Sequence, residues 1–289
     1  MNLITIKNGN NTWNFEIENN KYIICDTNNY YQILQSIRLF NSKEKSEYRS
    51  ETNFNTVVMK NEKELTLRNN LFIEISDSYS LIEDKKLTTK SLILKYLEVK
   101  LQNKIYFDTI GTIDILLESL AEEMNEDDSL NVRFNSVGYK QLIKMLTPFY
   151  IDEFQKDEFD LDYEQIILFQ LQLVDYIAKN SYKYDNTIVY GHINNISSKI
   201  VRKLKNLNSS IQLIFTNNYK ESMHINEVAL YEKSLIDFSN IEQFYIDYSQ
   251  QSFQQYSLQE VECMIIEYLK QNYTHKKKDI YQELAHFSK

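Results

Sequence analysis

The chain has 289 residues, of which 43% are hydrophobic and 25% are charged, so it can bury a full core and is not expected to be disordered. Its 32 basic and 41 acidic residues give a net charge of −9, which excludes a protein that coats nucleic acid over its whole surface. A local basic patch stays compatible with that charge. No segment has the apolar length of a membrane span and no signal peptide opens the sequence, so a cytoplasmic protein without membrane contact is expected.

The first elements are read from alternation and turn residues. Residues 3–7 and 12–18 alternate with period two around Asn8-Gly9-Asn10, which predicts a β-hairpin. The apolar run 21–26 predicts a strand that leads into a helix over 28–40. The polar segment 41–55 has no apolar period and is predicted to be a loop. A second strand is expected over 71–76.

A long helical region follows. Residues 88–125 show a helical pattern, with helices also expected over 136–150 and 163–179. An apolar stripe in the first of these is predicted to be core; it consists of Ile110, Ile113, Leu117, Leu120 and Met124. Strands over 187–190 and 211–216, with a helix over 196–207 between them, predict a βαβ unit. The remainder is predicted to hold a strand or hairpin near 228–238 and helices over 241–253 and 258–273.

The predicted fold is α/β, with a degenerate P-loop-like head, a mainly helical inserted lobe and a helical C-terminal appendage. Strand-helix units on both sides of the helical region assign residues 1–85 and 186–220 to the head. Residues 86–185 form the predicted helical lobe, and residues 221–289 the C-terminal extension. Cys25 and Cys263 match no metal or disulfide spacing, and both are predicted to be buried and reduced.

Neither strand-helix junction has the residues of a phosphate-binding loop. Residues 26–31 contain no glycine and no Lys-Ser/Thr pair, and residues 191–198 place Ile196 and Ser197 where Gly and Lys are needed. Of the four dispersed histidines only His192 follows a strand, and a histidine without a partner there is more typical of a surface or packing residue than of a general base. We therefore expect no bound nucleotide, no catalytic residues and no enzymatic activity.

Carboxylates gather at the end of one predicted helix and in the loop after it. Adjacent carboxylates at a helix C-terminus repel one another, and a calcium ion with oxygen ligands would relieve that repulsion. A solvated acidic turn explains the same pattern, since no EF-hand motif is present. The candidate metal ligands are Glu118, Glu122, Glu123, Glu126, Asp127 and Asp128.

Basic residues gather in two places, either of which could bind DNA phosphates. One is the helix of the βαβ unit, and the other is a looser series that leads through the first inserted helix. A solvated amphipathic face is the alternative for both. The candidate DNA-binding residues are Lys199, Arg202, Lys203 and Lys205 in the first group, and Lys90, Lys95, Lys100 and Lys104 in the second.

The order of elements resembles the Csn-two family, the ring proteins of type II-A CRISPR spacer acquisition. Three stretches carry the resemblance, namely residues 22–39, 114–146 and 169–215. The middle stretch has an acidic helix end, a short extended link over 131–134 and a new helix with Gln141-Leu142-Ile143-Lys144, which looks like the family's hinge. Two features match only the longer members, namely the insertion at 41–55 and the extension beyond residue 220.

The resemblance implies a non-catalytic tetrameric ring that binds double-stranded DNA ends without regard to sequence, in a lysine-lined hole, with calcium near the hinge. It also implies that the protein works with the CRISPR integrase and the RNA-guided effector nuclease in acquiring spacers. Two alternatives stay open. One is a metal-dependent enzyme that processes nucleotides or DNA. The other is a pure protein scaffold in the adaptation complex that never touches DNA.

Overall fold

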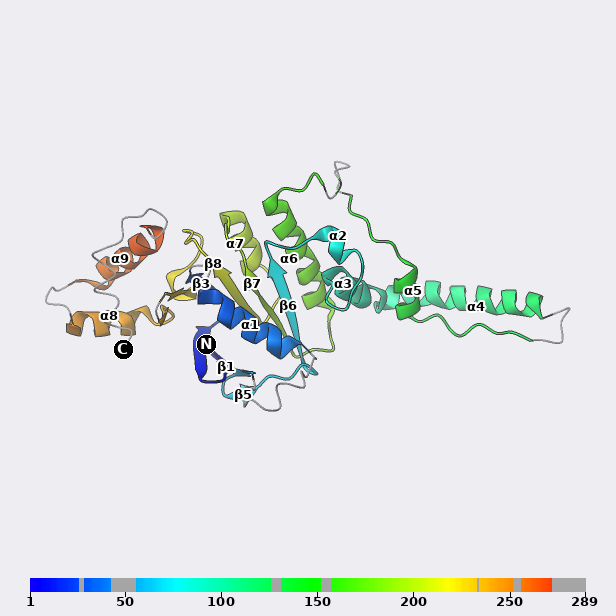
Figure 1. Cartoon of the computed structure of the whole chain (residues 1–289), viewed down its shortest axis with the longest axis horizontal. Coiled ribbons are helices and arrows are strands. Elements are labelled where there is room, and N and C mark those ends of the chain that lie inside the picture. Colours follow the sequence, from blue (N-terminus) through cyan, green and yellow to red (C-terminus); the bar gives the residue numbers. More distant parts are fainter. Residues whose placement is uncertain are drawn as a thin grey trace. The chain divides into compact units, whose positions relative to one another are not determined.

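The computed structural model describes residues 1–25, 29–42, 56–125, 131–151, 157, 159–232, 234–251 and 256–271. The chain divides into two compact units (Figure 1). Unit 1 comprises Met1–Ser78, Tyr163–Leu171 and Tyr182–Lys289, and unit 2 comprises Tyr79–Asp162 and Gln172–Ser181. The predicted α/β fold with helical lobes is confirmed.

A six-stranded sheet forms the centre of unit 1. Its strand order is β10-β9-β3-β8-β7-β6, and all neighbours are parallel except β9 and β10. The predicted strands are present. Strands β3, β7 and β8 are rich in apolar residues and buried along almost their whole length, as expected for the central strands of a parallel sheet. Their bounds are β3 Asn20–Cys25, β6 Asn70–Ser76, β7 Asn186–His192, β8 Ile211–Thr216, β9 Val228–Tyr231 and β10 Leu235–Asp237.

The predicted N-terminal hairpin belongs to a second, four-stranded sheet of order β2-β1-β4-β5. Strands β1 (Asn2–Asn8) and β2 (Asn11–Ile17) pair antiparallel, and Gly9 takes the first position of the two-residue turn with a φ of 60°. Two short strands, β4 (Val57–Lys60) and β5 (Lys63–Glu64), complete this sheet. They escaped the sequence analysis because runs of four and two residues are too short to show a period.

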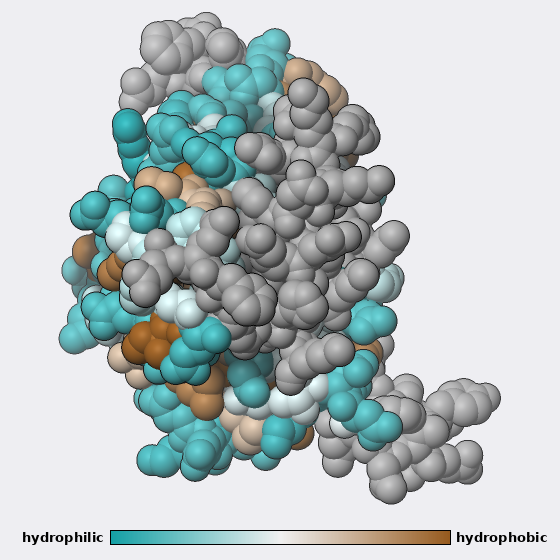
Figure 2. Space-filling model, turned by 90° about the vertical axis from the view of Figure 1, so that its left-hand side faces the viewer, coloured by the Kyte–Doolittle hydropathy of each residue, from teal (hydrophilic) through white to brown (hydrophobic). Residues whose placement is uncertain are grey.

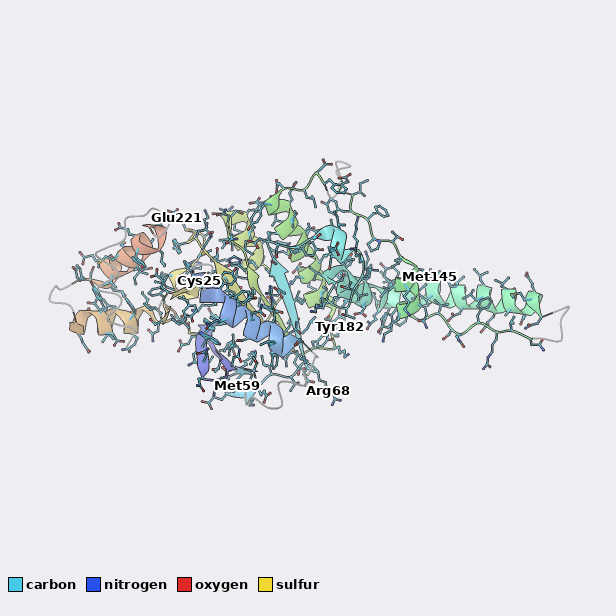
Figure 3. All side chains as sticks on the ribbon, viewed as in Figure 1. Cys25, Met59, Arg68, Met145, Tyr182 and Glu221 are labelled. Atoms are coloured by element: carbon cyan, nitrogen blue, oxygen red, sulfur yellow. The ribbon has the colours of Figure 1, made fainter. Side chains whose placement is uncertain are left out.

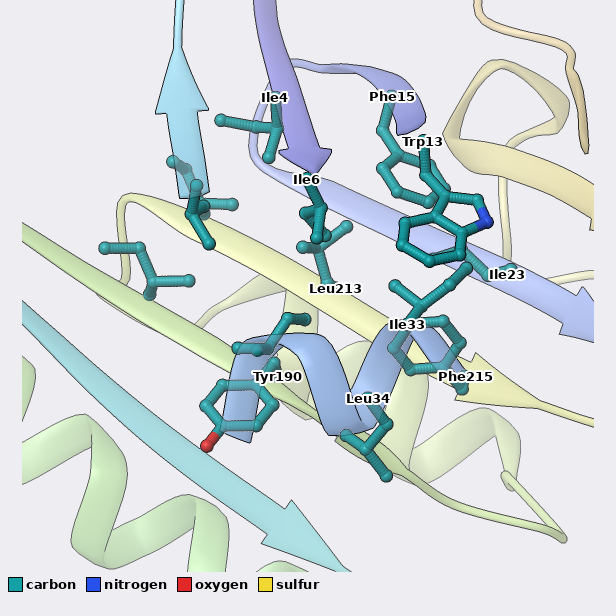
Figure 4. Packing of buried hydrophobic residues seen from close by; sticks show 14 of the residues in the cluster. Ile4, Ile6, Trp13, Phe15, Ile23, Ile33, Leu34, Tyr190, Leu213 and Phe215 are labelled. Carbon is teal, nitrogen blue, oxygen red and sulfur yellow. The ribbon is translucent and has the colours of Figure 1, made fainter. Parts of the chain in front are cut away.

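Helix α1 (Asn29–Asn41) packs where the two sheets meet (Figure 4). Its Ile33, Leu34 and Ile37 are buried with apolar side chains of β1 and β2, and with Ile23 and Phe215 of the six-stranded sheet. Side chains alternate along a strand, so the neighbours of these sheet residues point to the other face. There the side chain of Gln212 donates to the carbonyl oxygen of residue 204 in α7 (Ser198–Lys205).

Gly191 allows the close approach of β7 to β6. A Cβ atom at this position would lie 1.8 Å from the carbonyl oxygen of Ile75, which is far inside a van der Waals contact. In the sequence this glycine is the one glycine of the second strand-helix junction, where a phosphate-binding loop would lie. Its place inside β7 gives it a packing role instead.

Unit 2 is mainly helical, and α6 is shared between the two units. Asp84 holds the start of α3, because its two carboxylate oxygens accept the backbone N–H groups of Leu92 and Ile93 at 2.9 Å. The bounds are α2 Leu81–Asp84, α3 Leu92–Leu101, the 3-10 turn η2 Lys104–Tyr106, α4 Phe107–Met124, α5 Tyr139–Met145 and α6 Tyr163–Asn180.

Two predicted helices are shorter than expected. The region 88–125 is interrupted by η2, where the side chain of Asn103 accepts the backbone N–H of Ile105. The helix predicted over 136–150 is only α5, which ends at Met145. Thr147 precedes Pro148, and a residue before proline disfavours helical backbone angles.

The apolar stripe predicted to be core is not buried. Ala121 is the only buried residue that the structure gives for α4, while Leu120 and Met124 are exposed and Ile110, Ile113 and Leu117 are half-buried. The prediction was wrong because a helical period shows that one face is apolar but does not show which element covers it.

The region after residue 220 does not begin as a separate part. Strands β9 and β10 join the six-stranded sheet beside β3, after the 3-10 turn η3 (Ile225–Glu227). Helices α8 (Ile241–Gln251) and α9 (Leu258–Gln271) follow.

On the face shown in Figure 2, the described surface is mostly hydrophilic, with small separated apolar groups.

The two cysteines differ in environment. Cys25 is buried at the end of β3, as predicted, but Cys263 is exposed on α9. The prediction for Cys263 was wrong because the buried positions of α9 are Val261, Ile265, Tyr268 and Leu269, whose three- and four-residue spacing leaves Cys263 on another face.

A buried lysine ties β10 to β3. The ammonium of Lys21 is fully buried and donates to the carboxylate of Asp237, to the hydroxyl of Ser239 and to the carbonyl oxygen of Asn226. Asp237 also accepts the backbone N–H of Glu16 at 3.0 Å. The end of β10 therefore links β2 and β3 close to the turn between them.

Candidate nucleic-acid interface

Open α/β sheets bind ligands at the carboxyl ends of their parallel strands. In this protein a stacked pair of aromatic rings lies at that edge of the sheet. His192, the last residue of β7, stacks on Tyr30 of α1 with ring centroids 3.9 Å apart and planes 9° apart. Its Nδ1 atom lies 3.9 Å from a carboxylate oxygen of Asp77, which follows β6. His192 is buried, so its packing role is supported.

Hydrogen bonds link neighbouring loops at this edge of the sheet. The same oxygen of Asp77 accepts the backbone N–H of Asn194 at 3.1 Å, and the side-chain amide of Asn217 donates to the side-chain oxygen of Asn194 at 3.4 Å. Residues 26–28, which belong to the first strand-helix junction, lie outside the described part of the chain.

Burial lowers the pKa of His192, and the nearby carboxylate of Asp77 opposes that shift only in part. The folded protein therefore takes up this proton at a lower pH than the unfolded chain does, so the unfolded state binds more protons in the window below about pH 6.5. Consequently the free energy of unfolding is expected to fall as the pH drops from about 7 to 5.

A His192→Phe variant keeps a ring against Tyr30 but cannot bind a proton, so it is expected to lose this part of the pH dependence. The measurement is the denaturant midpoint of both proteins at several pH values between 7 and 5. A variant whose midpoint falls as steeply as that of the wild type would show that His192 does not cause the loss.

Helix α7 carries the first predicted basic group, and half of that group is already paired. Lys199 lies 3.2 Å from the carboxylate of Glu164, and Lys205 lies 3.0 Å from that of Glu227. Arg202 is exposed and Lys203 is half-buried, and neither forms a salt bridge with a carboxylate of the described residues. Serine at position 197 accepts the backbone N–H of Ile200 and starts the helix.

The second predicted basic group is spread over unit 2. Lys90 and Lys104 are exposed, and Lys95 is half-buried. Lys100 donates to the hydroxyl of Tyr96 at 2.9 Å and lies 5.2 Å from the centre of its ring. These lysines therefore differ in how freely they could contact another molecule.

The predicted metal ligands fall into two sets. Glu118, Glu122 and Glu123 are exposed on α4, whereas Glu126, Asp127 and Asp128 lie outside the described residues. Within the described part, no group of three or more His, Cys, Asp or Glu side chains is placed to hold a metal ion. The calcium site stays a prediction.

Helix α5 carries two lysines that were not among the predicted DNA-binding residues. Lys140 and Lys144 are both exposed, and residues 131–151 contain no Asp or Glu at all. By contrast α4 contains five acidic residues and no Lys or Arg. This segregation of charge could have been read from the sequence.

The structure resembles the crystal structure of Stu0660 of Streptococcus thermophilus, with a TM-score of 0.64 over 99% of this chain and 100% of that one. The sequence identity is 14%. This is a likeness of fold. A further match, to the recombination mediator protein RecF-ATPrS of the RecFOR pathway, has 12% identity over 80% of this chain and 95% of that chain, and its TM-score of 0.37 is too low to carry an argument.

Sequence comparison adds no relative. No protein-family model matches the chain, and no curated protein matches it. Among the helices that the structure describes, none is long and apolar enough to cross a membrane.

Proposed function

We propose that this protein binds double-stranded DNA ends without regard to sequence and without catalysis, as an oligomeric ring that supports CRISPR spacer acquisition. Three findings support the proposal: the resemblance to the Csn-two family, the α/β fold with helical lobes that it implies, and the likeness of fold to Stu0660 along the whole chain. The proposal includes a tetramer, a calcium ion near the acidic end of α4, and the CRISPR integrase and effector nuclease as partners.

The proposed oligomer is supported by a group of exposed apolar residues on unit 2. We define the apolar arm as α4 together with the extended link of residues 131–138. The link runs back along α4, because Asn125 exchanges two hydrogen bonds with the backbone of Val132 and Asp114 accepts the backbone N–H of Val137 at 2.6 Å (Figure 1). The exposed large apolar residues of the arm are Phe107, Ile115, Leu116, Leu120, Met124, Val132 and Phe134.

Single exposed apolar residues are ordinary, but seven on one short arm are not. Each large apolar side chain gains about 1.5–3 kcal/mol when it leaves water, so a protein surface that covers the arm is strongly favoured. A second copy of the chain is always present at equal concentration, and symmetric self-association is the commonest way to bury such a surface. The arm is therefore the proposed contact between subunits.

An assembly of this kind reconciles DNA binding with a net charge of −9. A ring can direct its acidic residues outward and gather its basic residues toward a duplex. Contacts to the sugar-phosphate backbone are enough for binding without sequence preference. The α7 lysines that pair with carboxylates show that part of the positive charge is used within the chain.

The test of DNA binding uses two linear duplexes of unrelated sequence, titrated at several salt concentrations. The proposal expects equal affinities for both duplexes and a linear fall of the logarithm of affinity with the logarithm of salt concentration. Absence of binding at low salt would reject it and favour the scaffold. Turnover of nucleotide or DNA on the same samples, with added Mg²⁺ or Ca²⁺, would favour the enzyme.

A further inference from the structure

Charge is strongly segregated within unit 2. Helix α4 holds five carboxylates and no basic residue, while residues 131–151 hold Arg133, Lys140 and Lys144 and no carboxylate. A duplex, with about one negative charge per 1.7 Å of its axis, is repelled by the first group and attracted by the second. A phosphate backbone that approaches unit 2 is therefore favoured at α5.

The geometry of α5 directs its two lysines to one side. Ile143 is the buried residue of this helix, and α5 packs against α3. At about 100° per residue, Lys140 and Lys144 lie about 40° apart around the helix, on the flank next to Ile143. Both lysines are exposed, as is Met145 beside them, which is 77% exposed and is labelled on α5 in Figure 3.

No salt bridge of the described residues involves either α5 lysine. In α7, by contrast, Lys199 and Lys205 would have to leave Glu164 and Glu227 before they could neutralise a phosphate. Breaking such pairs costs binding energy, and the carboxylates left behind would repel the duplex. The two candidate surfaces therefore differ in how much of their positive charge is available.

We propose that Lys140 and Lys144 of α5 are backbone-contacting residues for double-stranded DNA and that α7 is not the main DNA-binding helix. This inference rests on the proposed function, since it names the surface through which that function acts. It assigns DNA contact to two lysines outside the two basic groups that the sequence predicted. Contact to phosphates alone gives affinity without sequence preference.

The test compares charge-reversal variants in salt-dependent binding to a linear duplex. Lys140→Glu/Lys144→Glu is expected to weaken binding about tenfold to hundredfold at 0.1 M salt and to reduce the salt slope by about two for each subunit that touches the duplex. Lys140→Gln/Lys144→Gln, which removes the two charges without reversing them, is expected to weaken DNA binding less. The oligomer mass is read on the same samples to confirm unchanged assembly.

Two matched double variants complete the experiment. Lys7→Glu/Lys63→Glu makes the same charge change at exposed positions of the four-stranded sheet and is expected to change affinity much less. Arg202→Glu/Lys203→Glu makes the same charge change on α7. A loss with the α7 variant and none with the α5 variants would overturn the inference while leaving the proposed function intact. Absence of DNA binding by the wild type would instead reject the proposed function itself.

Discussion

Replacing Leu116 with glutamate is expected to break the proposed oligomer into smaller species. Leu116 lies in the middle of α4 and is 64% exposed in the single chain, so the substitution should change the stability of the isolated subunit by no more than about 0.5 kcal/mol. In a contact between two copies it would remove two buried leucines and place two charges in their positions. The expected loss of about 3 kcal/mol or more corresponds to a hundredfold weaker association.

The measurement is molar mass by sedimentation over a range of protein concentrations, together with DNA affinity. Ile246→Glu is the matched control, because Ile246 is an exposed apolar residue of α8, outside the apolar arm. It is expected to leave the mass unchanged. If the Leu116 variant keeps the mass of the wild type while the wild type is an oligomer, the arm is not the contact between subunits.

Replacing Asp237 with alanine is expected to lower the free energy of unfolding by about 3–5 kcal/mol, because the substitution leaves the fully buried ammonium of Lys21 without its carboxylate. Burial already lowers the pKa of Lys21, and Asp237 is the main group that opposes this shift. The remaining partners, the hydroxyl of Ser239 and the carbonyl of Asn226, carry no charge. Equilibrium denaturation measures the change.

Two further variants separate the buried pair from an ordinary surface pair. Glu221→Ala breaks the exposed contact with Lys270 and is expected to lower the free energy of unfolding far less than Asp237→Ala does, because water screens an exposed ion pair. Lys21→Met/Asp237→Leu removes both buried charges and is expected to regain most of the lost stability, since an apolar pair needs no partner. Equal losses for Asp237→Ala and Glu221→Ala would contradict the account of the buried tie.

The position of this tie bears on where the chain can be divided. The sequence predicted that the head ends at residue 220 and that a C-terminal extension follows it. The structure places Asp237 and Ser239 of that extension on Lys21 of β3. A lysine inside an apolar run was visible in the sequence, but its partner lies 216 residues away, and no local pattern identifies such a partner.

Much of the sheet could be predicted from the sequence because its signals are local. Asn8-Gly9-Asn10 fixes the hairpin turn, and the apolar runs of β7 and β8 mark buried parallel strands whose limits differ little from those predicted. The helix ends were less predictable. Pro148 follows α5, and the side chain of Asn103 starts the turn η2 just after α3, and neither feature appears as a loss of apolar period.

The candidate site was predicted less well than the fold, for a physical reason. The sequence shows that residues 199 and 205 are lysines, but only the fold shows that the carboxylates of Glu164 and Glu227 pair with them. In the same way the stripe on α4 is apolar in the sequence, and only the fold shows that little within the described chain covers it. Pairing and covering are long-range properties.

The central claim, that an oligomer of this chain binds DNA ends, is tested most directly with a linear duplex and a closed circular duplex of identical sequence. Binding to both is measured with and without calcium, and the mass of the protein is read on the same samples. The account predicts calcium-supported binding of the linear form alone, by a multimer, because a ring can pass only over a free end. Equal binding to the closed circle, or binding by a single subunit, would contradict it.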